Sequence, residues 1–383
     1  MSNPRAAIFP IHLPDKAFLF DEPEFCLEGG AEEWGQLEDA LAEWQAHDAR
    51  DLTVPEKMAV GGFTYEGNYY FEFHSSVKCV LREFCLPTLL ISDSDVSLKL
   101  SESLGRKEFV KMVESARERI ADGDIYQVNL AREFKASITD LDPWEFFTVL
   151  NWVTEAPLAA FLPFADQWIC SSSPELFLRM DGRRIETHPI KGTRPRDRDP
   201  LRDRQNAFEL CTSEKEIAEL VMITDLERND LGKICEYGTV QVPELIKHEA
   251  FSHVHHLVSK VEGELRKGIT PLSALKACFP GGSITGAPKK RAMEIIRELE
   301  PIQRGCYTGA LGYFGSDGSA QFNIAIRTCE IKGDDVRFFT GSGITWGSDP
   351  EKEFEETQHK AEGMLQALRV YLASRKAASP FRS

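Results

Sequence analysis

Glu175 and Lys191 have the residue types and the spacing for chemistry at an electrophilic carbon. Lys191 stands in the run His188–Thr193, between an apolar segment and a Gly-Thr pair. A lysine amine attacks electrophilic carbon once desolvation lowers its pKa, although most lysines are simply solvated. Glu175 precedes an apolar segment, where burial would raise the pKa of its carboxyl toward the range needed for proton transfer. The two residues are therefore candidates for a nucleophile and an acid.

The segment between them explains how they could meet. Residues 177–190 alternate apolar and polar side chains on both sides of Asp181-Gly182, a pair typical of a two-residue turn. This pattern predicts a hairpin. Because a hairpin brings its two ends together, we expect Glu175 and Lys191 to be neighbours.

Two acidic helical faces form the next signal. Glu216 and Glu219 are three residues apart in a predicted helix, and so are Glu353 and Glu356 near the C-terminus. Two such faces opposed would offer carboxylate oxygens, which suit Mg²⁺. Each face alone is more often a solvated helix surface. Ser213 followed by Glu216 is also a capping box, which gives Glu216 a structural explanation.

Glycine-rich stretches and one arginine complete the candidate site. Residues 279–289 open a predicted helix, where free N–H groups could receive an anion, but the run is not a Walker A loop. Residues 307–314 and 339–344 are typical of strand ends that allow close approach of a ligand. Arg327 lies in an apolar segment predicted to be a strand. Its guanidinium suits either a substrate carboxylate or a buried structural ion pair.

Other polar residues have ordinary explanations. Gln127, in the strand predicted over 125–130, would usually satisfy a neighbouring backbone group. The histidines at 248, 253, 255 and 256 lie in a strand-like setting that makes a shared tetrahedral site improbable, so we assign no zinc.

Composition excludes several classes of function. The 383 residues carry a formal net charge of -16, which argues against a nucleic-acid partner. The nine cysteines show no CxxC spacing and the N-terminus lacks a signal segment, which indicates reduced thiols in the cytoplasm. No apolar stretch approaches the ~18 residues that span a bilayer, so we expect no membrane insertion.

The chain reads as one interwoven catalytic unit over 101–375, preceded by a short lobe over 1–100 that packs on the main sheet. In that lobe Trp34, Leu37, Leu41 and Trp44 have helical spacing, and the aromatic segments 61–67 and 69–73 predict paired strands. A further amphipathic helix is predicted over 107–121, closed by Asp122-Gly123-Asp124. No Pro/Gly/Ser-rich linker divides the chain after about residue 100.

The order of these motifs resembles the chorismate-utilising enzymes over about residues 105–370. The matching segments are 125–130, 173–175, 189–193, 225–232, 256–259, 281–289, 307–314, 325–328 and 356–357. The resemblance implies an α+β fold, a sandwich of two antiparallel sheets flanked by helices, with the active site in a central cleft. Within the family, the aminodeoxychorismate synthase component I branch is the most similar.

The resemblance also implies roles for individual residues. Glu219 and Glu356 match Mg²⁺ ligands, with Glu216 and Glu353 beside them. Groups that hold the chorismate carboxylates are matched by Tyr307, Arg327, Gly343 and Lys360. Ser283 matches a position that lines the ring, and His256 matches the active-site histidine.

Two positions separate the branches of the family. Anthranilate synthases carry Ala where this chain has Lys191, and water-using isochorismate and salicylate synthases carry a lysine base where it has Gln127. The implied reaction is attack of Lys191 on ring C2 with departure of the C4 hydroxyl, assisted by Glu175 and Mg²⁺. Ammonia then adds at C4 and expels the lysine, which gives 4-amino-4-deoxychorismate for para-aminobenzoate and folate synthesis.

The implied partners are a glutamine amidotransferase subunit that supplies ammonia and an aminodeoxychorismate lyase that acts next. We find no nucleophile-elbow cysteine with His and Glu partners in this chain. The short N-terminal lobe lacks a clear Leu-Leu-Glu-Ser motif, so tryptophan inhibition is not expected, and use of free ammonia stays open. The alternatives are anthranilate synthase component I and a catalytically silent binding subunit.

Overall fold

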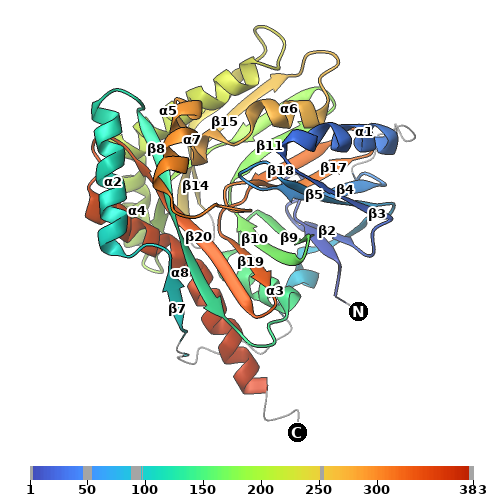
Figure 1. The fold of residues 1–383 in the computed structure, drawn as a ribbon, viewed down its shortest axis with the longest axis horizontal. Coiled ribbons are helices and arrows are strands. Elements are labelled where there is room, and N and C mark those ends of the chain that lie inside the picture. Colours follow the sequence, from blue (N-terminus) through green and yellow to red (C-terminus); the bar gives the residue numbers. More distant parts are fainter. Residues whose placement is uncertain (1–2, 46–53, 88–95, 97, 251–253, 379–383) are drawn as a thin grey trace.

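Two antiparallel sheets of ten strands each form the centre of the molecule (Figure 1). The computed structural model describes residues 3–45, 54–87, 96, 98–250 and 254–378. The first sheet has the order β16-β8-β20-β19-β10-β9-β1-β2-β6, with β7 paired to β8. The second has the order β13-β15-β12-β11-β18-β17-β4-β5-β3, with β14 paired to β15. The predicted antiparallel sandwich is confirmed.

The strands of the first sheet are β1 (Ala6–Ile8), β2 (Lys16–Phe20), β6 (Lys78–Leu81), β7 (Leu100–Glu102), β8 (Gln127–Ser137), β9 (Leu158–Phe164), β10 (Gln167–Ser173), β16 (Gly286–Ala287), β19 (Thr328–Lys332) and β20 (Asp335–Ile344). Those of the second are β3 (Phe25–Gly29), β4 (Met58–Phe63), β5 (Tyr69–His74), β11 (Leu176–Asp181), β12 (Arg184–His188), β13 (Ile190–Pro195), β14 (Gln241–Ala250), β15 (Val254–Glu264), β17 (Ala310–Gly315) and β18 (Ala320–Ile324).

The helices are α1 (Trp34–Gln45), α2 (Arg106–Ala121), α3 (Pro143–Thr154), α4 (Pro200–Cys211), α5 (Glu214–Gly232), α6 (Pro271–Cys278), α7 (Lys289–Leu299) and α8 (Pro350–Ala378), with short 3₁₀ turns η1 (Ala31–Glu33), η2 (Arg82–Cys85) and η3 (Gly282–Ile284). The helices predicted around Trp34 and over 107–121 are thus confirmed as α1 and α2. No helix in the described ranges is both long enough and apolar enough to cross a bilayer.

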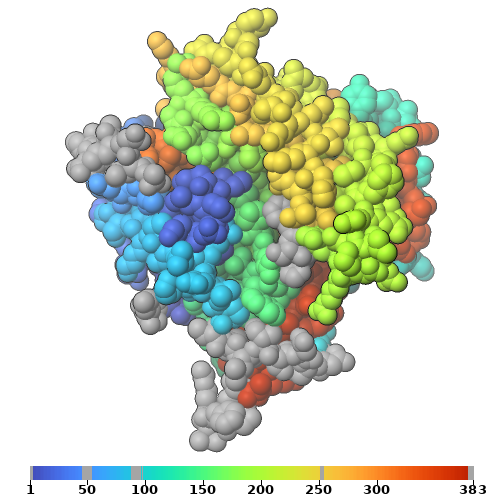
Figure 2. All heavy atoms as spheres, turned by 180° about the vertical axis from the view of Figure 1, so that it is seen from behind, coloured from blue at the N-terminus to red at the C-terminus, as the bar shows by residue number. Residues whose placement is uncertain are grey.

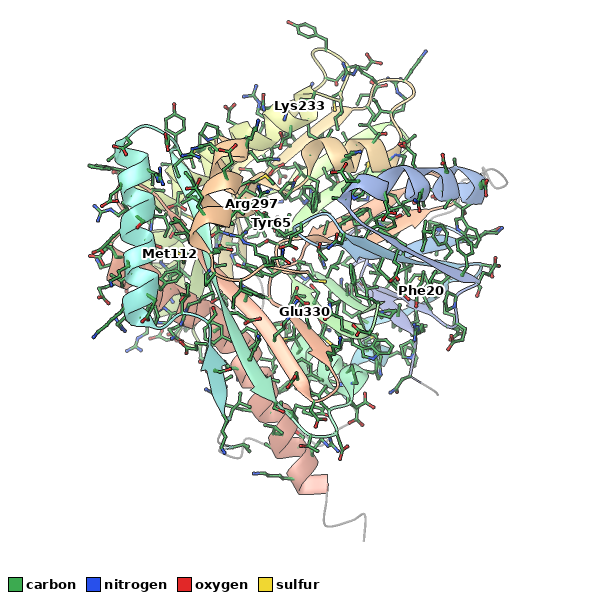
Figure 3. The ribbon with its side chains drawn as sticks, in the orientation of Figure 1. Phe20, Tyr65, Met112, Lys233, Arg297 and Glu330 are labelled. Atoms are coloured by element: carbon green, nitrogen blue, oxygen red, sulfur yellow. The ribbon has the colours of Figure 1, made fainter. Side chains whose placement is uncertain are left out.

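Three stacked cores make a four-layer arrangement. One core lies between the sheets and joins residues such as Phe20 (labelled in Figure 3) to Val60 and Tyr313. A second packs the first sheet on α3 and α8, and a third packs the second sheet on α1 and α6. Because both faces of the central strands are covered, β4 and β5 are buried along their whole length.

The strands of the first hundred residues extend both sheets. β1 pairs with β9 in the first sheet, and β4 pairs with β17 in the second. Figure 2 shows the blue and cyan surface of this segment adjoining the green surface of the strands that follow it. The predicted pairing of the aromatic segments is confirmed, because β4 and β5 are antiparallel neighbours. The domain boundary near residue 100 stays a prediction.

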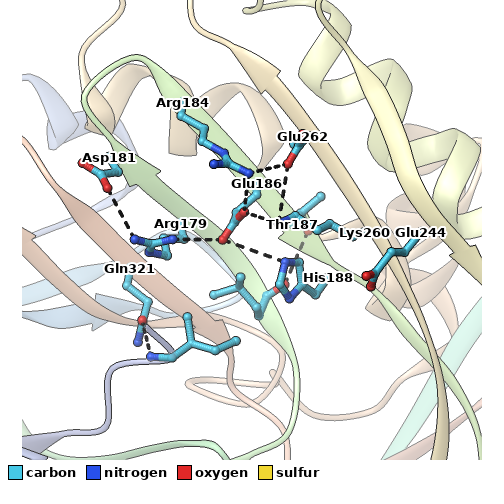
Figure 4. Close-up of polar contacts among 12 residues, drawn as sticks. Arg179, Asp181, Arg184, Glu186, Thr187, His188, Glu244, Lys260, Glu262 and Gln321 are labelled. Carbon is cyan, nitrogen blue, oxygen red and sulfur yellow. Dashed lines mark hydrogen bonds and ion pairs between the residues drawn. The ribbon is translucent and has the colours of Figure 1, made fainter. Parts of the chain in front are cut away.

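The predicted hairpin is formed by β11 and β12, with Gly182 in the turn at a φ of 57°. Its ends meet, because Leu176 pairs with His188. Figure 4 shows the charged residues that tie the hairpin to β15. Glu186 accepts from Arg179 at 3.2 Å and lies 2.8 Å from Lys260. The hairpin thereby presents its open end, and β13 after it, at a fixed position.

Candidate active site

Lys191 and Glu175 meet at the backbone and side chain of Ser283. The ammonium of Lys191 donates to the carbonyl of Ser283 at 3.0 Å, and the Ser283 hydroxyl bonds the Glu175 carboxyl. Burial raises the pKa of Glu175, while the Ser283 hydrogen bond and the charge of Lys191 act in the opposite direction. A carboxyl with a raised pKa beside an amine is the arrangement that general acid catalysis requires.

A β-bulge at Gly192 sets the direction of Lys191. Lys191 pairs with Leu257 and Thr193 with His256, so Gly192 is the extra residue, at a φ of 70°. A Cβ there would stand 2.6 Å from Leu210 and 3.2 Å from the Glu216 carboxylate, so only glycine fits.

His256 fastens this bulge. Its Nδ1 lies 3.0 Å from the Gly192 carbonyl, which can only accept, so Nδ1 carries the proton. Burial and the charge of Arg327 lower the pKa of His256 to about 4. His256 is therefore a neutral residue at physiological pH.

Three carboxylates on α5 and α8, those of Glu219, Glu353 and Glu356, face a shared set of lysines. Glu353 is buried, with Oε1 at 3.3 Å from the Lys215 ammonium, and Glu219 lies 3.9 Å from the same group. Burial raises the pKa of Glu219. For Glu356 burial acts in the same sense, but Lys360, Lys215 and Lys191 together hold its pKa below its usual range. Helices predicted to carry opposed acidic faces do bring them together.

The described residues contain no group of three or more His, Cys, Asp or Glu side chains arranged to hold a metal ion, but one observation favours a divalent cation at these carboxylates. Glu219 Oε1 and Glu353 Oε2 are buried without a hydrogen-bond partner in the described structure. Glu216 differs from the other three carboxylates. Its backbone N–H donates to the side chain of Ser213, which caps α5, and its carboxylate lies 3.7 Å from Arg194. Oxygen atoms left without donors are what a Mg²⁺ ion would use, and Glu219 is the residue best placed to offer one.

Gln127 does not serve the backbone. It is fully buried, and neither its amide oxygen nor its nitrogen has a hydrogen-bond partner among the described residues. The expectation that it satisfies a backbone group is thus wrong. It lies beside Gly343, where an added Cβ would come within 2.8 Å of the Gln127 nitrogen and 3.9 Å of the Glu219 carboxylate. Gln127 and Gly343 therefore belong to the same site as the acidic residues.

Arg327 is not on a strand, contrary to the prediction. It lies in the link where the chain leaves β18 in one sheet and enters β19 in the other, at a φ of 50°. Arg327 lies within ion-pair distance of no carboxylate among the described residues. The alternative expectation, that Arg327 forms a buried structural ion pair, is therefore also wrong. Burial lowers the pKa of its guanidinium. A cation without an anion inside a protein is costly unless a ligand completes it.

Tyr307 and Lys360 both lie next to Gly341 of β20. The Tyr307 ring stacks on Phe339 with centroids 5.3 Å apart, and its hydroxyl would be 3.1 Å from a Cβ at Gly341. Lys360 donates to the Gly341 carbonyl at 2.9 Å and pairs with Glu356 at 2.7 Å. Lys360 thus already has an anionic partner, unlike Arg327.

The glycine-rich loop 279–289 has an internal partner. The Gly282 N–H, one of the groups expected to receive an external anion, donates to Glu227 of α5 at 2.9 Å.

Two surface hollows, one near Arg183 and one near Lys135, contain none of the candidate residues. The central cleft stays a prediction.

The histidines divide into two environments. His248 Nε2 lies 2.9 Å from His255 Nδ1, whose other nitrogen lies 3.0 Å from Asp203. His256 faces Gly192 instead. The position at 253 lies outside the described residues.

Comparison with known proteins shows the family of the chain. The sequence profile described as chorismate binding enzyme matches residues 87–366. The chain belongs to the chorismate-binding enzyme family.

Relatives in this family carry two different names. The chain is 45% identical over 265 residues to "Anthranilate synthase component 1" of Methanothermobacter thermautotrophicus, covering 69% of this chain and 57% of that protein. It is 44% identical over 262 residues to "Aminodeoxychorismate synthase component 1" of Bacillus subtilis, covering 68% and 56%. This chain therefore matches little more than half the length of these curated relatives.

A solved family structure supports the fold. Anthranilate synthase component I from Streptococcus pneumoniae superposes with a TM-score of 0.79 at 28% identity, covering 91% of this chain and 92% of that one. Identity of 45% to one name and 44% to the other does not separate the two activities.

Sequence reasoning missed three groups of this chorismate-binding enzyme. The sequence could have pointed to Lys215, which precedes Glu219 by one helical turn. It could also have pointed to Glu227, which lies in the matched segment 225–232. Arg304 gave no signal beyond its place before Tyr307. It is buried, donates to the carbonyls of Ile284 and Asn129 at 3.1 and 2.7 Å, and lies over the ring of Tyr65 near the centre of Figure 3.

Proposed function

We propose that this chain is an aminodeoxychorismate synthase component I, which converts chorismate and ammonia to 4-amino-4-deoxychorismate. The observation that carries the proposal is the contact of Lys191 and Glu175 through Ser283. This places a candidate nucleophile beside a carboxyl whose raised pKa favours its acid form. Anthranilate formation needs no such amine, because the family resemblance gives those enzymes Ala at this position.

Substrate binding would use Arg327, which has no carboxylate partner among the described residues, together with groups that already have partners within the chain. Arg327 would supply a half-buried guanidinium for one carboxylate of chorismate, because a guanidinium can donate two parallel hydrogen bonds to a carboxylate. Tyr307 and Lys360 would contact the other carboxylate, and Gly343 leaves room for the ring beside Gln127. Ser283 would line the ring opposite.

Glu219 and Glu356 would hold Mg²⁺, with Glu216 and Glu353 beside them. The ion would supply positive charge toward a substrate carboxylate. The ammonium of Lys215, 3.3 Å from Glu353, balances the negative charge of that carboxylate.

The chemical step needs the neutral amine of Lys191 and the acid form of Glu175. A net transfer of one proton from the lysine to the glutamate produces both at once. The amine forms a bond to ring C2, the ring double bond shifts, and the C4–O bond breaks while Glu175 gives its proton to the departing hydroxyl. Ammonia then bonds at C4, the double bond returns, and Lys191 leaves C2 as an amine. Gln127 cannot act as a base, so it gives water no comparable activation.

The proposed partners are a glutamine amidotransferase subunit as ammonia donor and an aminodeoxychorismate lyase as the next enzyme. The name component 1 of both relatives supports a second component. Binding of the amidotransferase and use of free ammonia are distinguished by comparing turnover with glutamine plus partner and with an ammonium salt.

The deciding test is product identity. Purified protein is incubated with chorismate, Mg²⁺ and an ammonium salt at mildly alkaline pH, and products are identified by mass before and after adding aminodeoxychorismate lyase. We expect para-aminobenzoate only when the lyase is present. Lys191→Ala should reduce this product to background, while Lys247→Ala, an exposed lysine on β14, should match the wild type. Unchanged product from Lys191→Ala would remove the lysine from the mechanism.

Anthranilate synthase component I is the second candidate, favoured by the relatives of that name. Anthranilate and pyruvate formed without the lyase would select it. Chorismate binding without any turnover would instead identify a silent binding subunit.

A further inference from the structure

A buried carboxyl on α5 takes no part in the mechanism above. Glu227 is 2% exposed, and its Oε1 accepts the N–H of Gly282 at 2.9 Å. Its Oε2 has no hydrogen-bond partner within the described part of the chain. Burying a carboxyl is costly. We therefore expect the hydrogen bond from Gly282 to be the reason that Glu227 is buried here.

The Gly282 turn rests directly on α5. A Cβ at Gly282 would stand 2.6 Å from Leu226 and 2.9 Å from the Glu227 Oε1, so the turn cannot move closer and the hydrogen bond stops it from moving away. The next residue is Ser283, whose carbonyl accepts from Lys191 and whose hydroxyl bonds Glu175. One contact from α5 thus sets the residue that joins the nucleophile and the acid.

The same helix carries the candidate cation ligands. Glu219 and Glu227 are eight residues apart, and Glu216 and Glu227 are eleven apart, spacings of about two and three helical turns. All three side chains therefore lie along one side of α5. The helix links the acidic end of the site to the Ser283 turn.

We propose that Glu227 is a positioning residue, which holds the Gly282–Ser283 turn so that Ser283 can bind Lys191 and Glu175 together. The inference rests on the proposed function, because it deepens the roles of that same pair. Glu227 touches neither residue directly. It acts through one backbone N–H.

The charges around Glu227 agree with this role. Burial raises its pKa to about 7, the charges of Asp230 and Glu175 act in the same sense, and Lys289 and the Gly282 bond act against them. Lys289 is itself held by Asp230 and by the Cys278 carbonyl. Both the acid and the carboxylate form can accept from an N–H, so a glutamine should serve equally well.

The test compares Glu227→Gln, which keeps an acceptor oxygen, with Glu227→Met, which keeps length but removes it. Asp225→Asn, an exposed change on the same helix, is the matched control. We expect Glu227→Met to lower kcat by about tenfold or more, the effect of one buried donor left unpaired. The Mg²⁺ affinity from calorimetry should stay within about twofold, since the ligand end of α5 is unchanged. Glu227→Gln and Asp225→Asn should stay near wild type.

A second readout does not depend on turnover. The rate of reductive methylation of Lys191, followed by peptide mass spectrometry, should change in Glu227→Met and in Gly282→Ala, which crowds the same bond from the other side, but not in Glu227→Gln. Equal kcat and equal Lys191 labelling in wild type and Glu227→Met would overturn the inference, and so would equal impairment of the Met and Gln variants. A wild type that forms no product from chorismate refutes the proposed function, whereas the labelling comparison still decides the role of Glu227.

Discussion

Two regions of this protein bury charged side chains and treat them in opposite ways. Around Glu186, between β12 and β15, the charges are matched: the carboxylate has Arg179 at 3.2 Å and Lys260 at 2.8 Å. Although burial acts to raise it, the pKa of Glu186 lies below its usual range because of these cations. Around the candidate active site, Arg327 has no carboxylate at ion-pair distance in the described structure, and the uncharged amide of Gln127 has no hydrogen-bond partner there.

The difference separates a structural network from a binding site. A satisfied buried charge stabilises the fold it belongs to, whereas an unsatisfied one is a cost that a ligand can remove. The two regions belong to one fold: Glu186 lies on β12 of the second sheet, whereas Gln127 lies on β8 of the first sheet and Arg327 in the link between the sheets. Substitution of a charged residue shows whether that charge belongs to the structural network or to the binding site.

Glu227 lies between the two classes, with one oxygen bonded and one not. Its pKa of about 7 exceeds that of an unfolded glutamate, so the folded state binds the proton more tightly. Stability is then fully retained below about pH 4.5 and falls as the pH rises toward 7. The whole effect is about 3 kcal/mol. Chemical denaturation at pH 5 and pH 8 should show Glu227→Gln gaining on the wild type by that order, and a constant difference would contradict it.

Arg327 should behave as a ligand group. We expect Arg327→Met to weaken chorismate binding about a hundredfold, the loss of a charge-assisted bidentate pair. Because no internal carboxylate is left behind, the free energy of unfolding should not fall. Calorimetric titration with chorismate and thermal unfolding measure the two quantities. A large loss of stability would place Arg327 among the structural charges.

Glu186 should show the converse. Glu186→Gln leaves Lys260 and Arg179 without a full anionic partner, which we expect to lower the free energy of unfolding by about 2 kcal/mol. The kcat for chorismate should be unchanged. Urea denaturation and steady-state kinetics check this. A matched fall in kcat would show that the hairpin transmits strain to Lys191.

Lys215 is expected to give the smallest effect. Its ammonium competes with a divalent cation for Glu353 and Glu219, but half of its side chain is exposed and the ion pair is screened. Lys215→Gln should tighten Mg²⁺ binding about threefold, the size of a surface ion pair. Calorimetry with Mg²⁺ on the protein without substrate measures this. Weaker binding would mean that the lysine orients the carboxylates.

The parts of the site that sequence predicted well are those with local causes. Ser213 caps α5 through its own third neighbour, Gly182 makes the turn of its own hairpin, and the acidic pairs follow helical spacing. The parts it missed depend on distant residues. Gln127 was expected to find a backbone partner, and Arg327 was expected on a strand, because neighbouring residues could not show that the chain changes sheets there.

The sequence by itself determined the residue types, the hairpin, the helices and the family, because each follows from short-range periodicity, turn chemistry or an ordered set of motifs. Only the tertiary structure decided which buried groups are paired. Glu186 meets Lys260 across two strands, and Glu227 meets Gly282 over 55 positions of chain. Hydrogen-bond pairing is a property of three-dimensional neighbours, and those neighbours are fixed only when the two sheets and α5 pack together.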